Sequence, residues 1–166
     1  MKSNTKKLTT LALTISFALI LSYIESRIPT LVAIPGIKVG LANIAVIFTL
    51  YKFGAKEAVT VSIIRVLLVS MLFGSPVSMI YSAVGAILSL SSMILLKRFT
   101  PLREVAISVC GGVMHNVGQI AAASFLLSTN VFIYYLPFLL LSGTIAGIAV
   151  GVASAILIKR ISFDIK

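Results

Sequence analysis

The residues best suited to chemistry in this chain lie in the middle of an apolar segment. His115, Asn116 and Gln119 fall within a run from about Val105 to Leu127, and a helix of roughly 20 residues is enough to cross a bilayer. His115 and Gln119 are four residues apart, so one helix face carries both, with Asn116 beside His115. Polar side chains at that depth are costly if they face lipid. The pattern therefore predicts either hydrogen bonds between helices or the wall of a ligand cavity.

Arg65 is a second costly group, near the middle of another apolar segment. A guanidinium at the membrane centre costs at least about 2.5 kcal/mol on insertion scales, so it should pair or face water. Glu25 is the only carboxylate expected close by, and a structural contact between Arg65 and Glu25 is one interpretation. The other is an arginine that binds the carboxylate or phosphate of a ligand, which its planar fork suits.

These polar groups are expected at similar depths, in the middle and outer part of the membrane. A lysine and an asparagine near the outer ends of their segments add to them, although an outer-loop lysine is more often simply solvated. We therefore predict one cavity that opens outward, with these substrate-binding residues: Lys38, Asn43, Arg65, His115, Asn116 and Gln119.

Few groups in the chain could support catalysis. One histidine, one cysteine (Cys110) and no aspartate within the apolar segments do not make a plausible metal-ligand set. Cys110 is five residues before His115 and off its helix face, so a catalytic pair is not indicated. There is no glycine-rich phosphate loop and no carboxylate cluster for magnesium diphosphate. We expect no catalytic residue, metal or cofactor, and a protein that is not an enzyme.

Composition indicates an all-helical integral membrane protein. Of the 166 residues, 59% are hydrophobic and 11% are charged, whereas a soluble domain is about a quarter charged. The formal net charge of +10 comes from short clusters between apolar runs. That is the pattern that orients a protein in a lipid bilayer, and it argues against nucleic-acid binding.

The apolar runs predict a single domain, residues 1–166, built as a six-transmembrane-helix bundle. The expected spans are about 8–27, 39–51, 57–73, 77–96, 105–127 and 136–158. The second is short for a full crossing, so we expect it to be tilted or completed by the loop before it. That loop, residues 28–38, is the longest connection and contains Pro29 and the Pro35-Gly36 pair. Beside a membrane cavity, it is a natural lid.

The distribution of basic residues predicts that the chain lies in the cytoplasmic membrane with both termini in the cytoplasm. With the N-terminus inside, the outer side keeps only Arg27 and Lys38. The inner segments hold 11 of the 14 basic residues: Lys2, Lys6, Lys7, Lys52, Lys56, Lys97, Arg98, Arg103, Lys159, Arg160 and Lys166.

Small residues recur at helix-packing spacing in three segments, which lets helices approach closely in lipid. In the fourth and sixth segments we expect packing within the chain. The sixth carries Gly143, Gly147, Gly151 and Ala155. In the first segment, two interpretations are open: the small residues pack within the chain, or they meet a partner subunit. The predicted partner-interface residues there are Thr10, Ala12, Thr14, Ser16 and Ala18.

Five short motifs occur in order and together resemble one family. They are PGIKVGLANI at 35–44, RVLL at 65–68, LFGS at 72–75, SAVGA at 82–86 and HNVGQ at 115–119. The combination resembles the family labelled heptaprenyl diphosphate synthase component I, also called the Gx transporter family, over roughly residues 8–160.

The resemblance implies a prokaryotic substrate-binding S component of an energy-coupling factor (ECF) transporter. Such proteins have six helices, cover an outward-facing ligand with the first extracellular loop, and dock through the first helix on a shared transmembrane subunit that two ATPases drive. The solute would be small and anionic or amphipathic. The family label leaves a second hypothesis, a membrane subunit that assists a prenyl diphosphate synthase in isoprenoid or quinone biosynthesis. A self-contained channel is a third, but the apolar inner half of the chain argues against it.

Overall fold

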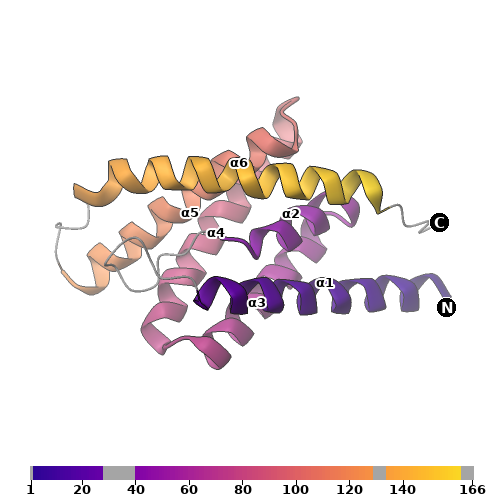
Figure 1. Ribbon diagram of the computed structural model, residues 1–166, viewed down its shortest axis with the longest axis horizontal. Helices are drawn as coiled ribbons and strands as arrows, with labels where there is room; N and C mark the ends of the chain where they lie inside the picture. The colour runs from indigo at the N-terminus through magenta and orange to yellow at the C-terminus, as the bar shows by residue number, and fades with distance from the viewer. Residues whose placement is uncertain (1, 28–39, 129–133, 162–166) are drawn as a thin grey trace.

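The structure is a computed structural model that describes residues 2–27, 40–128 and 134–161, with side chains from Thr5 onward. Within these ranges the regular structure is helical and contains no strand, which confirms the all-helical prediction. The helices are α1 (Lys2–Arg27), α2 (Asn43–Lys52), α3 (Ala55–Phe73), α4 (Pro76–Phe99), α5 (Glu104–Leu126) and α6 (Leu136–Arg160). Figure 1 shows α1 and α6 along the long axis of the molecule, with the start of α1 and the end of α6 at the same end.

Four of the helices are long and apolar enough to cross a membrane, namely α1, α4, α5 and α6. The chain is therefore a membrane protein. Helix α3 has 19 residues but carries Lys56, Glu57 and Arg65. Helix α2 has only 10 residues, about 15 Å of helix against a hydrocarbon core of about 30 Å. That all six helices cross the membrane stays a prediction.

The short helix α2 lies at the centre of the packed core. Every residue from Ile44 to Leu50 is buried, as expected for a helix that is hydrophobic all round. Its apolar side chains form one cluster with residues of the four helices that follow it: Ala58, Leu90, Met93, Ile107 and Val150. Because α2 is enclosed on all sides, its position fixes the spacing of the helices around it.

The C-terminal end of α2 is held by a lysine from α4. The ammonium of Lys97 donates a hydrogen bond to the carbonyl oxygen of Leu50 over 2.6 Å. The same ammonium lies 4.5 Å from the centre of the Tyr51 ring. A cation at the last turn satisfies a carbonyl that has no partner within its own helix.

Glycines bring α5 into close contact with both of its neighbours. A β-carbon at Gly112 would lie 2.6 Å from the carbonyl oxygen of Gly143, and one at Gly147 would lie 2.6 Å from the α-carbon of Val109. At the other interface, a β-carbon at Gly118 would lie 2.9 Å from the α-carbon of Gly85 in α4. The glycines of α6 therefore pack within the chain, as expected from their spacing.

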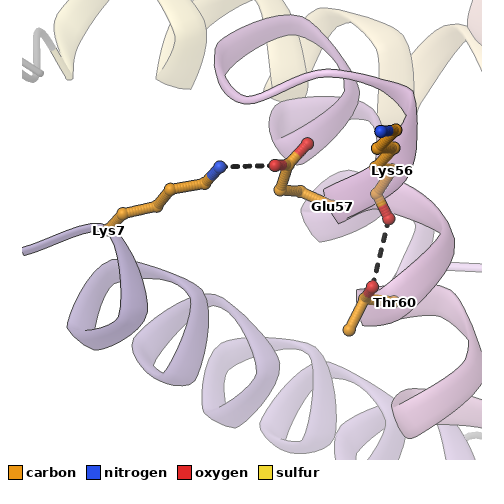
Figure 2. A network of polar contacts seen from close by, with 4 residues as sticks. All are labelled: Lys7, Lys56, Glu57 and Thr60. Carbon is orange, nitrogen blue, oxygen red and sulfur yellow. Dashed lines mark hydrogen bonds and ion pairs between the residues drawn. The ribbon is translucent and has the colours of Figure 1, made fainter. Parts of the chain in front are cut away.

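One ion pair joins the beginnings of α1 and α3. The ammonium of Lys7 lies 2.5 Å from a carboxylate oxygen of Glu57, and Figure 2 shows the lysine reaching across between the two helices. Beside it, the hydroxyl of Thr60 donates to the carbonyl oxygen of Lys56 over 3.1 Å. The ion pair ties the two helix starts together, whereas the Thr60 bond lies within α3.

The basic residues of the described chain gather at this end of the bundle. The Lys7–Glu57 pair joins the starts of α1 and α3, Lys97 joins the ends of α4 and α2, and Gly151 near the end of α6 lies against Val105 near the start of α5. These helix ends carry Lys6, Lys7, Lys52, Lys56, Lys97, Arg98, Arg103, Lys159 and Arg160. At the opposite end, the only basic residue within the described ranges is Arg27.

Candidate functional site

A small cavity lies between α1, α3, α4 and α5, beside the turn that precedes α2. Its volume is about 30 Å³, which is room for about two water molecules. Seven of the ten residues that form its wall are polar, and the ten are Ser22, Glu25, Gly40, Arg65, Val66, Val69, Ser70, Ser82, His115 and Gln119. Residues from four helices and one turn thus converge on one point, in the half of the bundle away from the basic end.

Glu25 is brought to the cavity by the buried face of α1. Ala18, Ser22 and Glu25 are all buried on that face. The carboxylate of Glu25 accepts a hydrogen bond from the backbone N–H of Gly40. Gly40 has φ +86°, a left-handed conformation that favours glycine, and its carbonyl accepts from the N–H of Asn43 over 2.9 Å to form the turn into α2.

Arg65 lies near the middle of α3 and is only 8% exposed. Its guanidinium is within electrostatic reach of the Glu25 carboxylate. The Nε atom has no hydrogen-bond partner among the described residues. Because buried polar groups are almost always hydrogen-bonded, this atom still has a hydrogen bond to donate.

His115 faces the same cavity from α5 and is 7% exposed. Its imidazole hydrogen-bonds to the backbone of Gly85 and is within electrostatic reach of Arg65. Within the described chain, Nδ1 has no hydrogen-bond partner. The close approach of α4 and α5 at Gly85 and Gly118 makes this position possible. Gln119, one turn further along, is also buried and lines the cavity.

The other predicted site residues are placed elsewhere. The amide nitrogen of Asn116 donates to the carbonyl oxygen of Leu139 over 2.7 Å and lies 3.5 Å from the hydroxyl of Ser142, so this side chain joins α5 to α6. Asn43 lines a separate space of about 10 Å³. Lys38 and the predicted lid lie outside the described residues.

A comparison of the sequence with protein families gives one match. A family model described as heptaprenyl diphosphate synthase component I matches residues 14–157. The chain belongs to this family. The matched region includes every residue that lines the cavity, and it confirms the resemblance indicated by the five motifs. No curated protein and no solved structure gives a significant match.

In this family member, sequence reasoning left four polar cavity residues out of the predicted site. Ser22, Ser70 and Ser82 line the cavity but were not among the predicted substrate-binding residues. Glu25, which was expected close to Arg65, was not among them either. A signal was available in α1, where Ala18, Ser22 and Glu25 follow each other at helical spacing on one face. A carboxylate on the buried face of a membrane helix points to a polar neighbour.

The predicted partner-interface residues of α1 divide between two faces. Thr14 and Ala18 are buried within the chain. Ala12 and Ser16 are exposed, and so are the large apolar side chains that follow them in sequence, Leu13 and Phe17. Only the second face is free to meet another subunit.

The cavity combines a guanidinium, an imidazole, an amide and hydroxyls with one carboxylate, that of Glu25. All of these except the carboxylate are groups that hold an anion or a polar headgroup. Arginine in particular matches the geometry of a carboxylate or phosphate. Within the described residues, no group of three or more His, Cys, Asp or Glu side chains lies together as a metal site would require.

Proposed function

We propose that this chain is the membrane-embedded substrate-binding S subunit of an ECF-type uptake transporter, without an enzymatic activity of its own. The observation that carries the proposal is the pair of buried atoms, Nε of Arg65 and Nδ1 of His115. Neither has a hydrogen-bond partner among the described residues, and both residues line one cavity. Two such atoms at one site call for a bound polar group.

The solute that suits this cavity is small, or has a small headgroup, and carries a carboxylate or phosphate. An oxyanion would accept from Arg65, and its oxygens could also meet the imidazole of His115 and the amide of Gln119. The Glu25 carboxylate balances the guanidinium when the solute is absent, so the buried arginine is never left without an opposite charge.

The orientation that fits the proposal has both termini in the cytoplasm. The helix ends that carry the basic residues lie together, and basic segments are retained on the cytoplasmic side. The cavity is in the other half of the bundle, near Glu25 of α1 and Gly40 before α2. A solute would then reach it from outside the cell.

The partner in this proposal is the shared transmembrane subunit of an ECF module, together with its two ATPases. Ala12 and Ser16 on the exposed face of α1 are small, so a helix of that subunit could approach closely. Thr14 and Ala18 are not part of this surface because they pack inside the chain.

The family description supports a second candidate, a membrane subunit that assists a heptaprenyl diphosphate synthase. The two functions predict different partners. Affinity purification of the tagged chain from its own membrane, followed by protein mass spectrometry, distinguishes them. Recovery of a membrane subunit with two ATPases supports transport, whereas recovery of a soluble synthase whose turnover rises on addition of the chain supports the alternative and contradicts the proposal.

A further inference from the structure

A groove separates α3 from α4 on the surface of the bundle. Its volume is about 360 Å³, and nine of its 11 lining residues are apolar. The volume falls in the range of small-molecule sites, about 300–1,000 Å³. Several lining side chains are exposed, namely Ile63, Leu67 and Ile87, so one side of the groove opens to the hydrocarbon of the membrane.

The groove and the polar cavity share a wall. Val66 lines both spaces. On the facing helix, Ser82 lines the cavity and its neighbour Ala83 lines the groove. Arg65, which lines the cavity, also directly precedes Val66 in α3. From this junction the groove runs along α3 to Val59 and along α4 to Ile94, which is roughly 10–17 Å of helix at 1.5 Å per residue.

The sizes of the two spaces suit the two parts of one molecule. The cavity, at about 30 Å³, takes water or part of a headgroup but no organic chain. The groove has room for such a chain, and its lining contains no basic side chain to bind an anion. The unpartnered Nε of Arg65 supplies the polar end, and the groove supplies the apolar end.

We propose that the solute is an anionic amphiphile, with its headgroup at Arg65 and His115 and its hydrocarbon chain in the groove between α3 and α4. This rests on the proposed function and names the substrate class of that site. The chain points from Val66 toward the basic end of the bundle. Bulk lipid does not satisfy the geometry, because its headgroup stays at the membrane surface, whereas Arg65 is the eleventh of the 19 residues of α3.

The test uses the full chain in nanodiscs, with dodecyl phosphate and butyl phosphate as probes and native mass spectrometry as the readout. We expect dodecyl phosphate to bind at least about tenfold more tightly than butyl phosphate, because burial of each methylene adds to affinity. Ala83→Leu narrows the groove near the junction and Ser91→Leu narrows it further along. Each should weaken dodecyl phosphate binding severalfold, because the leucine side chain occupies space that the hydrocarbon chain needs, and leave butyl phosphate unchanged.

Ala149→Leu makes the matched control, because Ala149 is exposed on α6 away from the groove, and it should bind both probes as the wild type does. Equal binding of the two phosphates, or full dodecyl phosphate binding in both groove variants, overturns the inference. In that case, loss of phosphate binding in Glu25→Gln/Arg65→Gln would show that binding still depends on Arg65. The cavity of the proposed function then stands. If the double variant binds dodecyl phosphate as well as the wild type, the headgroup is not at Arg65 and both proposals fail.

Discussion

The carboxylate of Glu25, near the end of α1, accepts a hydrogen bond from the backbone N–H of Gly40, in the turn that begins α2. The same carboxylate is within electrostatic reach of Arg65 in α3. Three segments that are distant in sequence are therefore held at one buried point. Because that point is the edge of the polar cavity, the contacts that stabilise the fold are also those that shape the site.

The pairing of Glu25 with Arg65 predicts an asymmetric response to mutation. Arg65→Gln should lower the free energy of unfolding by about 3–5 kcal/mol, because a buried carboxylate loses its opposite charge. Glu25→Gln/Arg65→Gln should recover much of that loss, since no buried charge remains. Thermal unfolding in a mild detergent measures both. A double variant as unstable as Arg65→Gln would show that the two side chains do not act as a pair.

The Lys7–Glu57 ion pair should behave differently. Lys7 and Glu57 join α1 to α3, but their side chains are 37% and 19% exposed, so water screens the attraction. Glu57→Gln should therefore change the free energy of unfolding by less than about 1 kcal/mol and should leave ligand retention unchanged. Loss of ligand in this variant would mean that the basic end of the bundle controls the cavity.

Mutations of Asn116 and Gln119 should have different effects, the first on the stability of the protein and the second on ligand binding. Asn116→Ala removes the hydrogen bond to the Leu139 carbonyl and should cost about 0.6–1.7 kcal/mol, the range for such bonds between membrane helices, with retained ligand unchanged. Gln119→Ala should reduce retained ligand because Gln119 lines the cavity. Unfolding curves and ligand analysis on the same preparations check both. The reverse pattern would place the solute on the α6 side of α5.

The contact between α5 and α6 should leave no space for a larger side chain in place of Gly147. A β-carbon there would lie 2.6 Å from the α-carbon of Val109, so Gly147→Val must push the two helices apart. We expect it to lower the melting temperature strongly or prevent folding, since overpacking alone costs about 1–3 kcal/mol. Ala149→Leu, on the exposed side of the same helix, should melt like the wild type. Equal melting of the two variants would contradict the close helix contact.

Much of the site was predictable because helix periodicity and depth depend on the sequence alone. His115 and Gln119 are one turn apart, and Arg65 was too costly to leave in lipid, so a shared polar space followed. The direction of Asn116 did not follow. It is next to His115 in sequence and therefore about 100° round the helix, and only the position of α6 decides that its amide meets Leu139.

Gly40 illustrates the same limit for the backbone. The second apolar segment looked too short for a full crossing, and α2 is indeed only 10 residues long. Hydropathy cannot show that the chain turns at Gly40 with a positive φ, nor that its N–H meets a carboxylate from α1. Both depend on the contact between Gly40 and Glu25, which are 15 residues apart in the sequence.

The central claim is that the cavity at Arg65 holds a small anionic molecule, and mass spectrometry of small molecules retained by the gently purified protein tests it most directly. The wild type and Ala149→Leu should each release the same anionic molecule in near-equal molar amount to the protein. Folded Glu25→Gln/Arg65→Gln should release none. Recovery of that molecule in the same amount from all three proteins, or its absence from the folded wild type, would contradict the account.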